Sequence, residues 1–138
     1  MSVARRTTVT AIAAAAISLV LLSGCAATQS KHDACNVVVK QLNSSTSELQ
    51  SAYGDIQNDP TKAQASLKKF GSELQSTTDK LTNPEVKKAS QKAADAVDDL
   101  QAKVGQLAKD PSGDTTAVQD SANKLQDTFR SLQKTCTA

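Results

Sequence analysis

Aromatic side chains are almost missing from this chain of 138 residues. Tryptophan is absent, and Tyr53, Phe70 and Phe129 are the whole aromatic set. Proteins that bind single-stranded nucleic acids stack the bases on aromatic side chains, and sugar-binding sites use similar platforms. The composition therefore argues against a site of either kind. We expect Tyr53 to be half-buried packing beside a helix seam rather than a ligand contact.

Histidine is equally scarce, since His32 is the only one in the chain. Serine-protease triads, most zinc sites, haem sites and the Glu-x-x-His pairs of di-iron bundles all use histidine. The densest group of carboxylates, at Asp95, Asp98 and Asp99, falls opposite a predicted apolar seam. We expect it to be solvated surface, with Asp99 pairing along its helix with Lys103. The sequence therefore predicts a protein that is not an enzyme and holds no metal or cofactor.

Long apolar runs are also missing, apart from one near the N-terminus. Arg5 and Arg6 precede a stretch of 14 mostly apolar residues, 9–22, which is shorter than the roughly 20 residues of a membrane-spanning helix. The stretch runs into Leu22-Ser23-Gly24-Cys25, which resembles the lipobox of bacterial lipoprotein signal peptides. The resemblance implies cleavage between Gly24 and Cys25, with acyl chains such as palmitate carried on the Cys25 thiol through a diacylglyceryl group.

The same resemblance places the protein in the cell envelope, anchored by lipid to the cell membrane and facing its extracytoplasmic side. Residues 1–24 would be removed, and the small, polar residues 25–33 would form a flexible tether. Without Arg5 and Arg6, 14 of the 16 basic residues remain against 14 acidic ones, so the exported part is neutral. Nucleic-acid binding, which needs a basic excess or stripe, is not expected.

Cysteine occurs only three times. An odd number of cysteines in an exported protein usually needs an explanation. If Cys25 carries the lipid, Cys35 and Cys136 remain as an even pair in an oxidising compartment, where disulfides form.

The three prolines divide the remaining residues into helical segments. Asp59-Pro60 and Asn83-Pro84 are Asx caps with proline at the first helical position. Asp110-Pro111 looks like a longer turn, after which Asp114 or Thr115 caps the next helix. Within each segment apolar residues recur at alternating spacings of three and four. In the first segment these positions are Cys35, Val38, Leu42, Ser45, Leu49, Ala52 and Ile56. The sequence therefore predicts an all-α fold with helices over about 34–57, 60–82, 84–109 and 115–136.

Short connections make successive helices antiparallel, so we expect an up-down-up-down four-helix bundle over residues 34–138. Cys35 begins the first seam and Cys136 ends the fourth, which places both at one end of the bundle and facing inward. The topology therefore predicts a Cys35–Cys136 disulfide. Many seam positions are Ala, Ser or Thr, so the core is thin, and closing a loop of about 100 residues should contribute roughly 4–5 kcal/mol.

Two glycines interrupt the helical segments. Gly71 and Gly105 each cost about 1 kcal/mol relative to alanine in a helix interior. We expect them to be tolerated there rather than to mark the close approach of a neighbour.

For the function of the bundle, the sequence favours a lipid-anchored, non-enzymatic module that binds or modulates another envelope component, a protein partner of unknown identity. The alternative is a carrier for a small apolar or lipid-like ligand, held between helices that the small seam residues leave slightly apart. A carrier should contain an apolar cavity of roughly a few hundred Å3, whereas an interaction module should be packed throughout.

Overall fold

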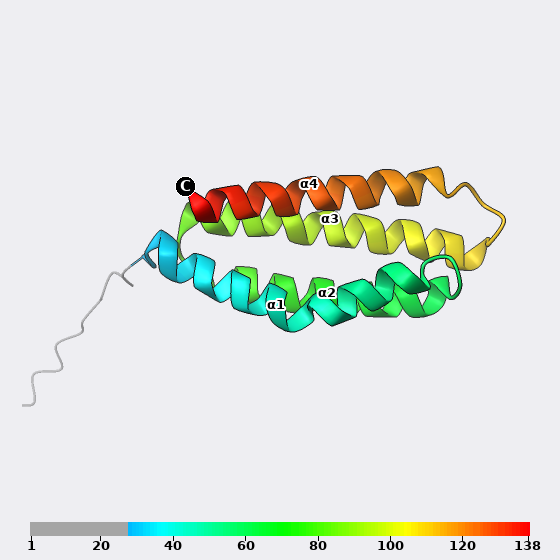
Figure 1. Ribbon diagram of the computed structural model, residues 1–138, viewed down its shortest axis with the longest axis horizontal. Helices are drawn as coiled ribbons and strands as arrows, with labels where there is room; N and C mark the ends of the chain where they lie inside the picture. The colour runs from blue at the N-terminus through cyan, green and yellow to red at the C-terminus, as the bar shows by residue number, and fades with distance from the viewer. Residues whose placement is uncertain (1–27) are drawn as a thin grey trace, which may run out of the picture.

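The computed structural model describes residues 28–138. The predicted signal peptide, the lipobox and Cys25 lie outside the described residues. Within them the chain forms four α-helices and no strand (Figure 1). The helices are α1 (Lys31–Asp55), α2 (Pro60–Asp79), α3 (Pro84–Lys109) and α4 (Thr116–Thr137). The all-α prediction is confirmed, and α3 has the predicted bounds.

Two of the helix starts follow the predicted Asx-Pro chemistry. The Asp59 side chain accepts a hydrogen bond from the backbone N–H of Lys62 at 3.0 Å. The Asn83 side chain accepts one from the N–H of Val86 at 3.1 Å. Each bond satisfies one of the free N–H groups of a first helical turn. α2 ends at Asp79, three residues earlier than predicted, and the N–H groups of Lys80 and Leu81 donate to the carbonyl oxygens of Thr77 and Thr78, three residues back, in a tightened last turn.

α1 begins at Lys31, three residues before the predicted start. Ser30 caps it by accepting a hydrogen bond from the N–H of Asp33 at 3.0 Å. Residues 31–33, assigned from sequence to a flexible tether, are therefore the first turn of the helix. The local signal for this start is a serine followed three residues later by an acid, Ser30 and Asp33.

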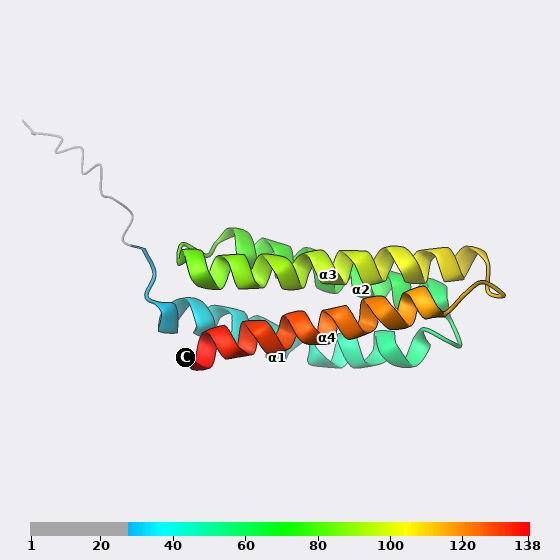
Figure 2. The ribbon, with the colours of Figure 1, turned by 90° about the horizontal axis from the view of Figure 1, so that it is seen from above.

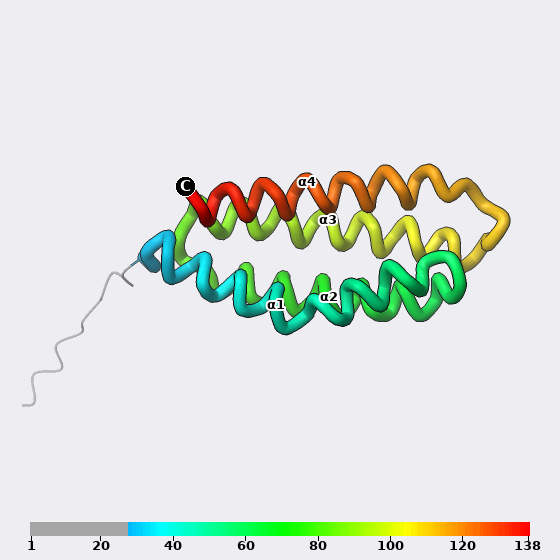
Figure 3. The backbone as a smooth tube through the Cα atoms, in the orientation of Figure 1, coloured from blue at the N-terminus to red at the C-terminus, as the bar shows by residue number. Residues whose placement is uncertain are grey.

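Successive helices run antiparallel in an up-down-up-down bundle. In Figure 1 the pair α3 and α4 lies above the pair α1 and α2, and Figure 2, from above, shows α1 and α4 in one layer with α2 and α3 in the other. Both views place the C-terminus beside the start of α1, and the tube of Figure 3 follows the same course. α1–α2, α2–α3 and α3–α4 contact each other along their lengths, whereas α1 and α4 contact each other sparsely.

The core is built from aliphatic and small side chains. Phe70 is the one aromatic side chain that is fully buried within residues 28–138. The largest aliphatic side chains with almost no exposed surface are the five leucines Leu67, Leu74, Leu81, Leu100 and Leu125. Gly71 and Gly105 lie where α2 and α3 approach closely, Gly71 against Val97 and Gly105 against the Gln64 side chain. The expectation that glycine is merely tolerated is wrong at Gly71, where a Cβ would lie 3.2 Å from the buried Val97 side chain, whereas at Gly105 the neighbouring atoms belong to the flexible end of Gln64.

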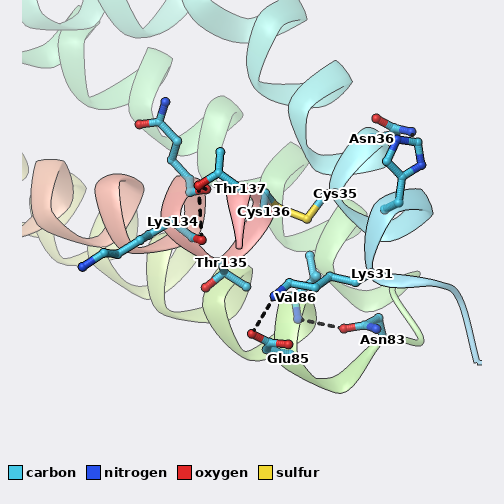
Figure 4. Close-up of a disulfide and its surroundings, with 12 residues drawn as sticks. Lys31, Cys35, Asn36, Asn83, Glu85, Val86, Lys134, Thr135, Cys136 and Thr137 are labelled. Carbon is cyan, nitrogen blue, oxygen red and sulfur yellow. Dashed lines mark hydrogen bonds and ion pairs between the residues drawn. A yellow bond between two sulfur atoms is a disulfide. The ribbon is translucent and has the colours of Figure 1, made fainter.

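The predicted disulfide is present. Cys35 and Cys136 are joined with a Cα–Cα distance of 5.6 Å across a sequence separation of 101 residues. Figure 4 shows the bond connecting the first turns of α1 to the last turn of α4. The bond lies at the end of the bundle where α1 begins and α4 ends, as the antiparallel topology requires.

Candidate functional site

The described surface has an apolar groove between α1 and α4, with a volume of about 500 Å3. Its apolar surface comes from Val39, Leu42 and Leu49 of α1, Phe70 of α2, and Phe129 and Leu132 of α4. Polar side chains border it at His32, Asn36, Asn43, Thr46, Gln133 and Thr137. The Cys35–Cys136 disulfide also contributes to the lining. We call this depression the α1–α4 groove.

The groove exists because two seam positions of α1 are not covered by α4. Leu42 and Leu49, both predicted to be core residues, remain half-buried at the edge of the hydrophobic core. The buried positions of α1 are Ala34, Cys35, Val38, Ser45 and Ala52. Among these, Ser45 bonds to α2, so part of the seam of α1 turns away from α4.

Hydrogen bonds between α1 and α2 fix this rotation of α1. Ser45 donates a hydrogen bond from its hydroxyl to Glu73 Oε2 at 3.0 Å. The Gln41 amide donates to the same Glu73 oxygen at 3.1 Å and to the Ser45 hydroxyl at 2.9 Å. On the α2 side Lys69 forms ion pairs with Glu48 of α1 and with Glu73. Because the buried Ser45 hydroxyl has its acceptor on α2, α1 lies with this side against α2, and the side with Leu42 and Leu49 faces the α1–α4 groove.

Phe70 and Phe129 form the aromatic part of the groove. Their ring centroids are 6.2 Å apart with an interplanar angle of 65°, an edge-to-face arrangement. Phe70 is 1% exposed, and Phe129 is half-buried. The pair therefore closes the deep side of the groove and gives it an apolar floor from α2 and α4.

The α1–α4 groove has His32 at one end of its lining. The residues that line it include no Asp, Glu, Lys or Arg. His32 lies beside Asn36, with 3.2 Å between His32 Nδ1 and Asn36 Nδ2. A groove of this composition has no pair of titratable groups for acid–base chemistry. What it can do chemically is to exclude water from an apolar molecule and to bind polar atoms at its border.

The three aspartates of α3 do not form a common site. Asp95 accepts a hydrogen bond from Gln91 of its own helix at 2.9 Å, and Asp98 is exposed. Asp99 faces α4, where it accepts a hydrogen bond from Ser121 at 2.8 Å and lies 3.8 Å from the Lys124 ammonium. The predicted pairing of Asp99 with Lys103 is therefore wrong, since the fourth helix supplies nearer partners.

Tyr53 packs against the hydrophobic core of the bundle and is half-buried, as predicted. Burial raises the pKa of its hydroxyl above the usual value. The side chain is not part of the α1–α4 groove. Tyr53 is therefore a packing residue.

Residues 28–138 contain no group of three or more His, Cys, Asp or Glu side chains arranged to hold a metal ion. In the same part of the chain, none of the four helices combines the length and the apolar character that a membrane span needs. Comparisons with protein-family models, curated proteins and solved structures give no match. Residues 28–138 therefore form a disulfide-linked antiparallel four-helix bundle with an apolar groove on its surface.

Of the site residues predicted from sequence, the structure brings Cys35 and Cys136 together, while Gly24 and Cys25 lie outside the described residues. The groove residues were not predicted as a site. The spacing of Leu42 and Leu49 is that of a seam and predicts core positions for both. The signal that could have found the groove is the polar Ser45 at the centre of the α1 seam.

Proposed function

We propose that this protein is a lipid-anchored, non-enzymatic component of the cell envelope that binds a small apolar or lipid-like ligand in the α1–α4 groove. The observation that carries this proposal is the groove itself. Its volume of about 500 Å3 lies within the range of small-molecule sites. The groove has an apolar floor and a polar border, as small-molecule sites usually do, and in such sites the apolar groups give affinity and the polar groups give orientation.

The anchor in this proposal comes from the sequence. The Leu22-Ser23-Gly24-Cys25 motif follows an apolar stretch of the length found in signal peptides. Two acyl chains give stable membrane attachment, whereas one is marginal. A diacylglyceryl group on Cys25 would therefore hold the bundle at the membrane.

Burial of a hydrocarbon chain supplies the driving force for binding. Each methylene removed from water contributes about 0.8 kcal/mol. A chain lying in the groove also covers the exposed parts of Leu42, Leu49 and Phe129. Immobilising the ligand costs part of this free energy. Because the groove is open on one side, it suits a single hydrocarbon chain of moderate length.

A helical module that docks a protein partner is the second candidate. The observation that favours it is the exposure of two valines on α1, Val37 at 39% and Val39 at 46%. Val39 belongs to the α1–α4 groove, and Val37 lies outside it. The two side chains are alike in type, helix and exposure, so they form a matched pair that separates the two functions.

The test is a binding titration with a fluorescent long-chain fatty acid, using the chain from Gln29 onward, which contains all four helices. Val39→Glu places a carboxylate in the groove without disturbing a buried position. We expect it to weaken binding at least tenfold, about 1.4 kcal/mol, because the ligand must displace a hydrated charge. Val37→Glu is the control and should bind like the original protein. Absence of saturable binding, or equal binding by both variants, would contradict the proposal.

A further inference from the structure

The residue before the N-cap of α1 is attached to the turn between α2 and α3. The Gln29 backbone N–H donates a hydrogen bond to Thr82 Oγ1 at 2.8 Å, and Gln29 Oε1 accepts one from the Thr82 N–H at 3.0 Å. The Asn83 amide donates a third bond to the Gln29 carbonyl oxygen at 3.3 Å. A further link at this end, between Lys31 and Glu85 at 3.1 Å, appears in Figure 4. Gln29 is therefore a fixed part of this end of the bundle.

Only Ala26, Ala27 and Thr28 lie between Cys25 and Gln29. Four Cα–Cα steps span at most about 14 Å. The opposite end of the bundle is farther away, since the 26 residues of α3 make a rod of about 39 Å. If Cys25 is lipidated, as the proposed function holds, the end with Gln29 must therefore lie at the membrane surface and the opposite end must point away from it.

The α1–α4 groove opens at this same end. His32 and Thr137, in the first turn of α1 and the last turn of α4, belong to its lining. From Cys35 the groove follows α1 to Leu49, 14 residues and about 21 Å of helix. One leaflet of a bilayer has a hydrocarbon depth of about 15 Å, half of the whole core. The groove is thus long enough for an acyl chain of a membrane lipid.

We infer that the ligand of the α1–α4 groove is one acyl chain of a lipid from the surrounding bilayer, which enters from the membrane at the end where α1 begins. The chain lies on Leu42, Leu49 and the Phe70–Phe129 pair. The head group stays at the membrane-facing end, beside the polar side chains of Asn36 and Gln133. This inference rests on the proposed function and specifies its ligand and the route of entry.

The occupant is a neighbouring lipid rather than the protein's own anchor. Stable attachment takes two acyl chains, and a single chain binds a membrane only marginally. If one chain of the Cys25 lipid moved into the groove, only one chain would hold the protein, and its attachment to the membrane would be marginal. Moving a chain of a neighbouring lipid from the bilayer into the groove exposes the open side of that chain to water, and this cost is offset because the chain covers the half-buried apolar side chains of the groove.

The experiment uses full-length lipidated protein in phosphatidylcholine vesicles that contain a phosphatidylcholine with a photoactivatable diazirine in one acyl chain. Intact-mass analysis first establishes the lipid on Cys25. After irradiation, peptide mapping should locate crosslinks on the groove segments with Leu42, Leu49 and Phe129. Val39→Glu should lower this crosslinking at least fivefold, and Val37→Glu should leave it unchanged.

A longer tether tests the route of entry. Inserting about twenty Gly and Ser residues between Thr28 and Gln29 adds a flexible span of about 25 Å and frees the bundle end from the membrane. We expect crosslinking in vesicles to fall at least fivefold, while the titration with fluorescent fatty acid in solution stays as in the original protein.

Two failures are distinguishable. If fatty acid binds in solution with the Val39 dependence described above, but vesicle crosslinks miss the groove or ignore the tether insertion, the inference is overturned and the proposed function stands. If neither fatty acid nor vesicle lipid reaches the groove, the ligand-binding function itself fails. An unmodified Cys25 in protein from membranes would overturn the anchor and the inference together.

Discussion

At the scale of single residues, the glycines within helices each lower helix stability relative to alanine by a similar amount, but their surroundings in the fold differ. A Cβ added to Gly54 would have no atom within 4 Å outside its own helix backbone. A Cβ added to Gly71 would lie 3.2 Å from Val97 Cγ1 and 3.1 Å from Asp98 Oδ1. Val97 is fully buried. Neither glycine has a positive φ, so alanine fits the backbone at both positions.

Gly54→Ala should therefore stabilise the protein by about 0.5–1 kcal/mol, because alanine restricts the unfolded chain and favours the helix. Gly71→Ala should raise the free energy of unfolding by about 1 kcal/mol less than Gly54→Ala does, since the added Cβ crowds a close-packed contact between α2 and α3. Urea unfolding of the two variants and the original protein measures the difference. Equal gains would mean that the two helices separate freely at Gly71.

At the scale of elements, each helix start depends on side chains within a few residues of it. For α4 the sequence predicts either Asp114 or Thr115 as the cap. In the structure Thr115 makes no side-chain cap, and Asp114 Oδ1 accepts the hydrogen bond from the Thr116 N–H at 2.8 Å. Hydrogen bonds from the hydroxyl and then the backbone N–H of Thr116 lower the pKa of Asp114 below its usual value.

A carboxylate with a lowered folded pKa stabilises the fold above its unfolded pKa, and this contribution is lost as the pH falls through the folded pKa. Asp114→Ala should therefore lower the thermal unfolding midpoint at neutral pH, and the difference from the original protein should shrink as the solution is acidified through that range. Asp120→Ala, which removes an exposed carboxylate from the same helix, is the control. A constant difference at every pH would show that Asp114 acts without its charge.

At the scale of the whole molecule, the disulfide compensates for the sparse contact between α1 and α4. The helices pack in the order α1, α2, α3, α4, and the ring closes mainly at Cys35–Cys136. Along much of the side between α1 and α4, which is the fourth side of the bundle, the groove takes the place of packed core. A covalent link is therefore needed more here than in a bundle whose four sides are all packed.

Reducing the disulfide, or replacing both cysteines by serine, should lower the unfolding free energy by roughly 4 kcal/mol, since the closed loop is about 100 residues. In a domain of this size the midpoint should fall by about 15 °C or more. Circular dichroism melts with and without reductant measure the shift, and the double serine variant should not respond to reductant. A shift of a few degrees would contradict this view of the fourth side.

The prediction of the fold succeeded where local chemistry decided it. The Asx-Pro pairs at residues 59–60 and 83–84 mark helix starts by themselves, and short turns force neighbouring helices antiparallel. That topology brings Cys35 to Cys136 without any knowledge of packing. The candidate site could not be predicted in the same way. Leu42 and Leu49 have the spacing of core residues, and spacing does not say which neighbour covers them.

The sequence by itself determined four antiparallel helices and their disulfide, because caps, prolines and apolar period act over a few residues. Only the tertiary structure decided how far α1 is rotated about its axis. The bonds of Ser45 and Gln41 to Glu73 hold α1 against α2, and those of Gln29 hold the residue before the α1 cap against the α2–α3 turn. These partners lie 28 to 53 residues away in the chain. A hydrogen bond between residues so far apart forms only after the helices have packed, so the open groove is a property of the packed bundle.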